Sequence, residues 1–389
     1  MLPTEAAKAH AALVATYPAE AQVQIHKITV KLLYLGFPAL FTRMVEGPVV
    51  RTFYFKPTEA FKFQSIFSKE EELAGTLAVE SVRISRELGE CAIAVPRQDR
   101  ELIRFDQCLH KMLTSEETAS MALPLLMGQN TKGEHLYADL AMQPHLLIAG
   151  ATGSGKSIYT AQLICSLALF RSPSDLEFIL VDTKNLDLVL FKSLEHAKYV
   201  IDNISDLRAA LSELLEEVRH RNKQMSGIAR SIKEWNALGF GKPMQYKVLI
   251  IDELADIVDT DNSYLAQFKK AERPPAIQDL LKQIAQISRA AGVHLVMATQ
   301  RPSIKVTPGD FKTNLPARVC FKLPTMADSR VILDENGAEN LLGLGDYLYK
   351  VTGSDVVRRA HSAFVSMNDI ATIITQHEQI RSQYAKQNA

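Results

Sequence analysis

Apolar residues follow two kinds of pattern in the larger, C-terminal part of this chain. From Pro144 onward, short continuous apolar runs alternate with longer segments whose apolar residues recur at helical spacing. The short runs occupy residues 145–149, 178–181, 248–251, 294–298 and 317–323. Helical stripes separate them, for example Leu207, Leu211, Leu214, Leu215 and Val218, and Ile277, Leu280, Leu281, Ile284 and Ile287. Buried strands that alternate with helices predict an α/β fold with a mostly parallel sheet.

Residues 1–97 show a different pattern, which predicts a small, separate α+β domain. The spacing of apolar residues predicts helices and strands in mixed order rather than in strict alternation. We expect helices over 3–16 and 69–79, strands over 25–35 and 49–55, and two short strands around Gly89 within 82–95.

The rest of the chain is expected to form one large domain over residues 98–370. Its first part, 98–143, reads as a connecting region with strands over 123–127 and 135–140. Residues 371–389 are expected to form a C-terminal helix or tail.

Composition excludes several classes of protein. Lys plus Arg and Asp plus Glu both number 44, so any surface that binds nucleic acid must be a local basic patch. No segment approaches the ~18 uncharged apolar residues that span a bilayer, and no signal peptide is visible. We therefore expect no direct insertion into a membrane. The cysteines match no disulfide framework or zinc spacing, which favours a reduced, cytoplasmic protein (Cys91, Cys108, Cys165 and Cys320).

The strongest chemical signal lies between the first buried run and the helix that follows it. Residues 150–157 read GATGSGKS and fit the phosphate-loop pattern G-x-x-x-x-G-K-[ST]. Glycines let backbone N–H groups approach phosphate oxygens, and a helix N-terminus favours negative charge. Lys156 can then reach the β- and γ-phosphates, and the Ser157 hydroxyl can ligate Mg²⁺. The eight candidate residues are Gly150, Ala151, Thr152, Gly153, Ser154, Gly155, Lys156 and Ser157.

An accidental Lys-Ser after a glycine-rich turn is the alternative interpretation of this segment. The order strand, glycine loop and helix is the context that the phosphate-loop hypothesis requires, so we favour binding of ATP with Mg²⁺.

A second signal is the sequence VLIIDE at residues 248–253, in which a buried strand ends in two acids. Such acids are costly to bury without a cation, which a bound metal ion supplies. We assign Asp252 to Mg²⁺ and Glu253 to polarisation of the attacking water. A third signal is Thr299-Gln300 at the end of another apolar run, where Gln300 is placed to sense the γ-phosphate. A strand end that simply turns polar is the alternative for this third signal.

The stretch 145–349 resembles the motor domain of the FtsK/SpoIIIE family of DNA translocases. The similarity is carried by the blocks HLLIAGATGSGKS, VLIIDELADIV, SRAAGVHLVMATQRPS and DSRVILDENGAENLLGLGDYLY. Weaker similarity at 47–50 and 82–96 is to the small α-type domain that precedes this motor. The resemblance implies a RecA-like P-loop ATPase that assembles as a homo-hexamer and pumps double-stranded DNA. Family members often carry a membrane anchor and a winged-helix domain, and we expect neither here.

The resemblance also implies that a neighbouring subunit supplies an arginine to the γ-phosphate. No basic residue lies within 112–131, so the candidates are Arg289 and Arg330, which fall in the matching blocks. Such an arginine would neutralise charge on the phosphate and link hydrolysis to assembly.

Two segments are candidates for contact with DNA. Residues 217–242 contain six basic residues and two acids, and within this segment Arg230 and Lys233 are the candidates for phosphate contact. Lys305 and Lys312 form the second set. A solvated helix end with a basic bias is the alternative. For the whole chain, the alternatives to a DNA motor are an ATPase for protein secretion or conjugative transfer, and a non-motor ATP switch on DNA.

Overall fold

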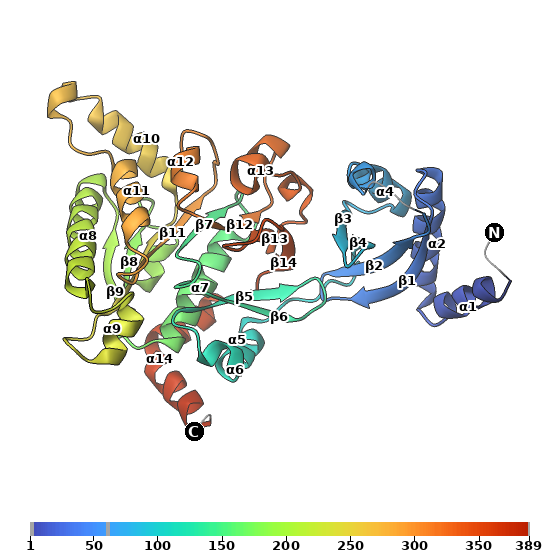
Figure 1. Ribbon diagram of the computed structural model, residues 1–389, viewed down its shortest axis with the longest axis horizontal. Coiled ribbons are helices and arrows are strands. Elements are labelled where there is room, and N and C mark those ends of the chain that lie inside the picture. Colours follow the sequence, from blue (N-terminus) through green and yellow to red (C-terminus); the bar gives the residue numbers. More distant parts are fainter. Residues whose placement is uncertain (1–3, 60–62, 388–389) are drawn as a thin grey trace. The chain divides into compact units, whose positions relative to one another are not determined.

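The computed structural model describes residues 4–59 and 63–387, and the chain folds as two compact units (Figure 1). The smaller unit consists of Met1–Leu102 with Gln129–Glu134, and the larger of Ile103–Gly128 with His135–Ala389. Each unit is built on a sheet of its own.

The smaller unit is a four-stranded antiparallel sheet in the order β1-β2-β4-β3, with helix α2 packed against β1. Its hairpin between β3 and β4 turns at Leu88 and Gly89, which both have positive φ, as a tight two-residue turn requires. The elements are α1 (Thr4–Ala15), α2 (Ala19–Tyr34), β1 (Ala39–Glu46), β2 (Val50–Pro57), α3 (Gln64–Phe67), α4 (Glu70–Leu77), β3 (Arg83–Glu87) and β4 (Glu90–Pro96).

One expectation for this unit is wrong, because the expected strand over 25–35 lies in helix α2. Its β-branched residues favour a strand locally. However, the residues that the fold buries are Ile25, Ile28 and Leu32, which are three and four positions apart. That spacing places them on one face of a helix, and burial of this face against the sheet outweighs the local preference.

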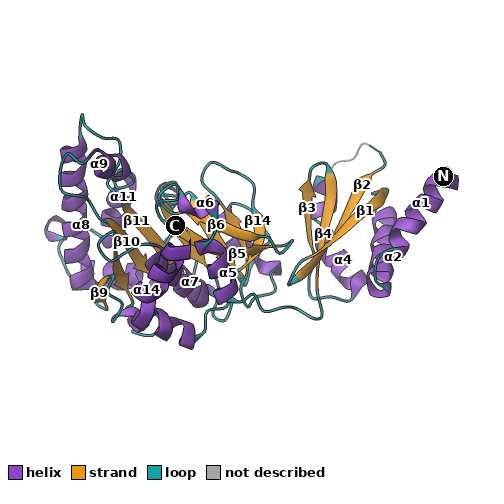
Figure 2. Cartoon of the chain, turned by 90° about the horizontal axis from the view of Figure 1, so that it is seen from below, coloured by secondary structure: helices purple, strands orange, loops and turns teal. Residues whose placement is uncertain are grey.

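The larger unit is a ten-stranded sheet in the order β6-β5-β14-β13-β12-β7-β11-β10-β8-β9. From β12 to β9 the strands are parallel, and β13 is antiparallel to both β12 and β14. Helices enclose the strands of this unit (Figure 2), with α8 packed against α11 and α7 against α14. The mostly parallel α/β fold predicted from the sequence is therefore confirmed.

The strands of this unit are β5 (Pro124–Asn130), β6 (His135–Asp139), β7 (His145–Ala149), β8 (Leu176–Val181), β9 (Ala197–Ile201), β10 (Tyr246–Ile251), β11 (Val293–Thr299), β12 (Ala317–Phe321), β13 (Asp346–Lys350) and β14 (Arg358–His361). The α-helices are α5 (Phe105–Leu113), α6 (Glu116–Ala119), α7 (Lys156–Phe170), α8 (Ile204–Met225), α9 (Ile232–Leu238), α10 (Leu254–Leu265), α11 (Ile277–Ile287), α12 (Gly309–Lys312), α13 (Met326–Leu333) and α14 (Met367–Gln387). Three 3₁₀ turns complete the list, η1 (Leu188–Phe191), η2 (Lys270–Glu272) and η3 (Ala338–Asn340).

All four cysteines are free and buried, and burial raises the pKa of Cys91 and Cys108 to about 12. At neutral pH these two thiols are therefore protonated and unreactive. Within the described residues, no helix combines the length and the apolar character that crossing a membrane requires.

Two histidines lie side by side in the centre of the larger sheet, His145 in β7 and His294 in β11. The Nδ1 atom of His145 accepts the amide of Leu295 at 3.0 Å, so its Nε2–H donates to the carbonyl of Ala285, also at 3.0 Å. His294 donates from Nδ1 to the carbonyl of Pro144 at 2.8 Å. Burial lowers the pKa of His145 to about 3 and that of His294 to about 4. Both rings are therefore neutral near neutral pH.

We expect the free energy of unfolding to fall as the pH drops below about 6.5, the ordinary pKa of an unfolded histidine. Because the native pKa values are depressed, these rings contribute stability that is complete above that pH. This stability is lost toward pH 4, on the order of 3 kcal/mol for His294. The measurement is the thermal midpoint of the chain between pH 7 and pH 4. His294→Gln should flatten the slope of the thermal midpoint against pH. His26→Gln, at an exposed histidine of α2, should leave this slope unchanged. Equal slopes in the His294→Gln and parent chains would contradict this prediction.

Candidate nucleotide-binding and catalytic site

Residues 150–157 connect the buried strand β7 to helix α7, the strand–loop–helix arrangement predicted for them. Gly153 and Gly155 have φ of 77° and 111°, conformations that favour glycine. A Cβ on Gly150 would lie 2.6 Å from Ser154 Oγ, and one on Gly155 would lie 2.6 Å from the amide nitrogen of Gly345. The glycines are therefore required both by backbone conformation and by the close packing around the loop.

Neighbouring loops hold this phosphate loop in place. The amide of Ala151 donates to the carbonyl of Lys322 at 2.9 Å, and the amide of Gly345 donates to the carbonyl of Ser154 at 2.9 Å. The hydroxyl of Thr152 donates to the side-chain carbonyl of Gln300 at 2.8 Å. The loop is thus fixed by the segments after β12 and β11 and by the turn before β13.

A buried ion pair fixes the turn before β13. Asp346 accepts two hydrogen bonds from Arg359, at 2.9 and 2.7 Å, and its Oδ2 also accepts the amide of Leu342 at 2.8 Å. Burial by itself raises the pKa of Asp346, but the neighbouring Arg359 guanidinium, together with His361, outweighs it and holds that pKa well below its usual range. The carboxylate therefore keeps the turn that contains Gly345 against the phosphate loop.

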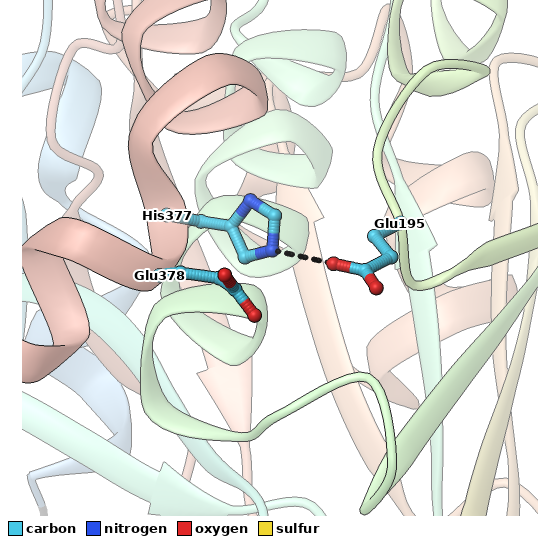
Figure 3. A group of neighbouring side chains, drawn as sticks. All are labelled: Glu195, His377 and Glu378. Atoms are coloured by element: carbon cyan, nitrogen blue, oxygen red, sulfur yellow. Dashed lines mark ion pairs between the residues drawn. The ribbon is translucent and has the colours of Figure 1, made fainter.

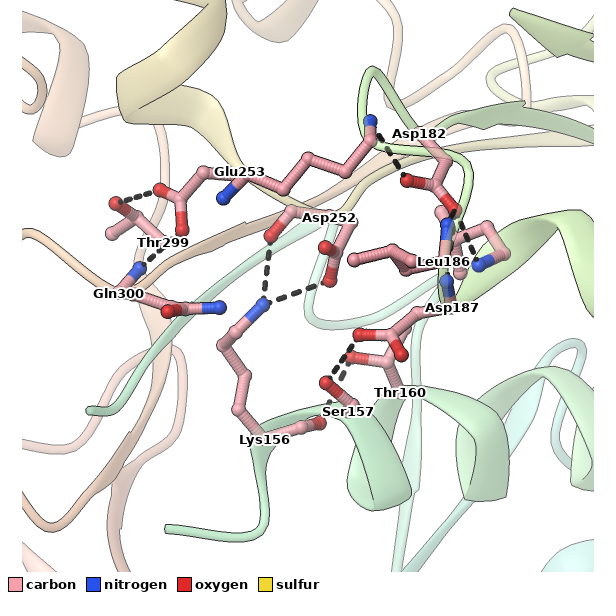
Figure 4. A network of polar contacts seen from close by, with 12 residues as sticks. Lys156, Ser157, Thr160, Asp182, Leu186, Asp187, Asp252, Glu253, Thr299 and Gln300 are labelled. Carbon is pink, nitrogen blue, oxygen red and sulfur yellow. Dashed lines mark hydrogen bonds and ion pairs between the residues drawn. The ribbon is translucent and has the colours of Figure 1, made fainter. Parts of the chain in front are cut away.

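Lys156 is buried at the start of α7 and points toward the end of β10 (Figure 4). Its ammonium group donates to the carbonyl and to Oδ1 of Asp252, both at 2.8 Å. The structure thus brings the predicted lysine and the predicted metal ligand into direct contact.

Glu253 lies next to this pair and is held by the end of β11. Its Oε1 accepts the hydroxyl of Thr299 at 2.7 Å, and its Oε2 accepts the backbone amide of Gln300 at 2.8 Å. Glu253 also caps α10, because Oε1 accepts the amide of Ala255 at 3.3 Å. Since the side chain of Gln300 bonds to Thr152, one residue connects the phosphate loop to Glu253.

Sequence reasoning missed two carboxylates at the end of β8. Asp182 accepts the amides of Leu186, Asp187 and Leu188 at 2.9–3.0 Å, and so shapes a tight turn (Figure 4). The turn brings Asp187 to Ser157, whose hydroxyl donates to Asp187 Oδ2 at 2.6 Å. The sequence feature that could have identified Asp182 is its position directly after an apolar strand. No short motif singles out Asp187.

The predicted basic residues lie in several places. A cavity of 410 Å³ is lined by Arg230, Lys233 and Arg289 together with Tyr246, the first residue of β10. It therefore lies at the edge of the sheet where the parallel strands begin, opposite the phosphate loop. Arg330, which donates to Asn336 Oδ1 at 2.7 Å, does not line it.

Lys305 and Lys312 form ion pairs within the larger unit. Lys305 Nζ lies 2.6 Å from Asp259 Oδ1, and Lys312 Nζ lies 2.6 Å from Asp334 Oδ1. Each lysine therefore already has a carboxylate partner.

A basic segment that the sequence analysis overlooked follows α10. We call residues 266–276 the basic arm, because its Lys269, Lys270 and Arg273 are exposed and none has a carboxylate partner within the described residues. Its base is fixed by Asp261, which accepts the amide of Ile277 at 2.9 Å and pairs with Arg208. The composition signal was weak, since this short basic run adjoins the acid-rich α10.

Family models match both units of the chain. Residues 109–304 match the FtsK/SpoIIIE family, and residues 5–96 match the FtsK alpha domain.

Curated relatives are named DNA translocase FtsK. That of Pseudomonas syringae pv. tomato is 33% identical over 382 residues, covering 90% of this chain and 46% of the relative. That of Treponema pallidum is 37% identical over 343 residues, covering 86% and 41%. The chain thus spans less than half the length of these relatives.

Two solved structures share the fold. The pCW3 conjugation coupling protein TcpA, in its monomer form with ATPγS, has a TM-score of 0.62 at 20% identity, covering 92% of this chain and 99% of that one. The cytoplasmic domain of the Thermomonospora curvata Type VII secretion ATPase EccC has a TM-score of 0.58 at 22% identity, covering 71% and 34%. Since the family match extends over half of the sequence and the fold agrees with it, the chain belongs to the FtsK/SpoIIIE family.

Proposed function

We propose that this chain is a motor that moves double-stranded DNA in the cytoplasm with the energy of ATP hydrolysis, as a ring of six subunits. Membership of the FtsK/SpoIIIE family makes the chain an ATPase, and its curated relatives are named DNA translocases. One observation carries the proposal for DNA. Helix α10 begins directly after its N-cap Glu253, close to the phosphate loop, and ends at the basic arm.

The residues of the phosphate loop fit a triphosphate with Mg²⁺. The glycine conformations leave backbone amides accessible at the N-terminus of α7, and Ser154 Oγ is buried without a hydrogen-bond partner within the described residues. Lys156 and residues 150–155 would hold the phosphates, and Ser157 with Asp252 would hold Mg²⁺. The ion supplies positive charge for the phosphate oxygens.

Asp187 would act on the same metal site through Ser157. Because the hydroxyl of Ser157 donates its hydrogen to Asp187, its lone pairs are left for a cation. Asp187 is thus a positioning residue.

Glu253 would take the proton of the attacking water, and Gln300 would report the γ-phosphate. Both carboxylate oxygens of Glu253 accept hydrogen bonds, so its orientation is fixed before the nucleotide binds. The side chain of Gln300 bonds to the phosphate loop while its amide holds Glu253. A shift of the phosphate loop around a γ-phosphate would therefore be transmitted through Gln300 to Glu253.

The cavity lined by Arg230, Lys233 and Arg289 supports the proposal of a ring in which one subunit completes the nucleotide site of the next. Arg289 lies four residues before β11, and the phosphate loop lies beside the end of that strand, where the amide of Gly150 donates to the carbonyl of Thr299. Seven strand residues span about 23 Å, so Arg289 cannot reach its own nucleotide. We propose that Arg289 contacts the neighbour's γ-phosphate. Arg330 in that role, and DNA contact by Arg230, Lys233, Lys305 and Lys312, stay predictions.

The basic arm would contact the DNA backbone. Lys269, Lys270 and Arg273 suit a motor that acts on any sequence, because unpaired positive charges bind phosphates without reading bases. Asp261 and Arg208 fix the base of the arm, so a rotation of α10 would carry the arm with it. Hydrolysis at one end of α10 would in this way move DNA at the other.

One structural neighbour is a conjugation coupling protein, and it supports an alternative cargo, which is DNA transferred between cells. A protein cargo is the alternative suggested by the secretion ATPase. A non-motor ATP switch on DNA is the third. Duplex stimulation of ATP turnover favours a DNA motor over a protein cargo, and displacement of a third strand from a triplex requires movement along duplex DNA.

We expect Glu253→Gln to bind ATP normally but to lose turnover by about 10²–10⁴-fold, because the amide cannot accept the proton of water. A motor then also loses triplex displacement. A switch keeps its ATP-dependent assembly on DNA, and that outcome would exclude the motor. Glu71→Gln, at an exposed glutamate of α4, is the matched control and should behave as the parent. Lys156→Ala should lose nucleotide binding itself.

We expect Asp187→Ala to raise the Mg²⁺ concentration for half-maximal ATP turnover by about tenfold, with little change at saturating Mg²⁺. The hydroxyl of Ser157 loses the acceptor that orients it. Asp187→Asn, which keeps an acceptor oxygen, should restore part of the affinity. Asp202→Ala, at an exposed carboxylate, is the control. An unchanged Mg²⁺ dependence in Asp187→Ala would remove this residue from the site.

We expect the triple change Lys269→Ala, Lys270→Ala and Arg273→Ala to weaken duplex binding and the stimulation of ATP turnover by DNA. Each lost phosphate contact lowers the slope of log affinity against log salt by about 0.9, so the slope should fall by roughly 3 units. The control is Lys282→Ala with Lys31→Ala, which removes two lysines already paired with carboxylates. A triple variant with the salt dependence of the parent would contradict DNA contact by the arm.

A further inference from the structure

We propose that Glu195, His377 and Glu378 form a site for a divalent transition-metal ion such as Zn²⁺, separate from the nucleotide site. Glu195 lies in the loop between η1 and β9, and His377 and Glu378 are neighbours on α14. Figure 3 shows the ring of His377 directed at the Glu195 carboxylate, with the Glu378 carboxylate beside it. We call these three residues the His377 cluster.

The distances within the cluster suit a metal ion after small rotations. One ligand atom from each residue lies within 4.8 Å of the other two, and His377 Nε2 lies 3.5 Å from Glu195 Oε2. Tetrahedral zinc with nitrogen and oxygen ligands at about 2.0–2.2 Å separates its ligand atoms by about 3.3–3.6 Å. Glu195 and Glu378 are exposed and free to close that gap, whereas buried His377 is held in place.

The buried imidazole is the observation that points to a ligand. His377 is only 6% exposed, yet neither ring nitrogen has a hydrogen-bond partner within the described part of the chain. An unsatisfied buried polar atom costs about 1–3 kcal/mol. A metal ion on Nε2 would remove this penalty there. His196 packs edge-on against the ring at 5.2 Å, which fixes its orientation.

The charges around the cluster favour a cation. Glu195 and Glu378 contribute two negative charges, and Arg381, one turn further along α14, contributes one positive charge near His196. One imidazole with two carboxylates is a ligand set that zinc accepts, with a position left for water. The positive charge of Arg381 near the cluster opposes a bound cation, so its removal should strengthen metal binding.

The location suggests a structural role for the ion. Helix α7 begins at the phosphate loop, and the carbonyl of Arg171, just beyond its end, is 2.8 Å from His196 Nε2. Since α7 has 15 residues, this point is about 22 Å from the phosphate loop. Because α14 packs along α7, an ion in the cluster would tie α14 to the loop before β9. The inference does not depend on the proposed function.

The test uses the full chain, stripped with a chelator and free of nucleotide. Titration with ZnCl₂ by calorimetry should show one site that is absent in His377→Ala, and Zn²⁺ should raise the thermal midpoint of the parent chain. Co²⁺ in place of Zn²⁺ should give visible absorption from the same site. Glu195→Gln and Glu378→Gln should each weaken binding by at least about tenfold, whereas Arg381→Gln should tighten it.

The control is His26→Ala, which removes an exposed histidine of the other unit and should bind Zn²⁺ as the parent does. Glu378→Gln changes an exposed side chain, so it keeps the test valid if His377→Ala fails to fold. The proposal is overturned if the parent binds no Zn²⁺, or if Glu378→Gln and the parent bind it equally. A simple ion pair between His377 and Glu195 would give the first of these results.

Discussion

The larger unit of this protein depends on the pairing of opposite charges that are almost completely buried. Lys156, Asp252 and Glu253 are each 5% exposed or less, and they meet where β7, β10 and β11 end. An unpaired buried charge costs several kcal/mol, so the contact of Lys156 with Asp252 can open only when other charges replace it. A triphosphate would replace Asp252 beside the lysine, and Mg²⁺ would replace the lysine beside Asp252. The buried pair would thus make binding of the nucleotide and of the metal depend on each other.

The same constraint explains why the candidate catalytic residues are connected by strand ends rather than by long side chains. Glu253 is the first residue after Asp252, and its partners Thr299 and Gln300 terminate the adjacent strand β11. Gln300 reaches the phosphate loop through Thr152. Parallel strands bring their carboxyl ends to one edge, so four short segments can share one rigid network. Helix α10 starts directly after Glu253, so it is attached to this network at its first turn.

The sequence predicted the parts of this unit that depend on local pattern. The strand, glycine loop and helix at residues 145–170 and the acids after β10 follow from the spacing of apolar residues and from chemistry. Asp187 and the His377 cluster could not be predicted, because their partners are 30 or more positions away in the sequence. The helix at Ala19–Tyr34 was expected in part as a strand because β-branched residues there obscured the helical spacing of the buried positions.

The carboxyl ends and the amino ends of the parallel strands in the larger sheet carry complementary chemical groups. Where the parallel strands end, the sheet carries the phosphate loop and buried acids, and where they begin it carries a cavity with three basic residues. No rearrangement within one rigid sheet brings these ends together, because each strand separates them by its own length. The arginine and lysine side chains of this cavity could act on a nucleotide only if the cavity faced the phosphate loop of another copy of the chain. Repetition of that contact generates either a closed ring or an open filament. The proposed function requires the ring, which would keep DNA enclosed while individual sites turn over.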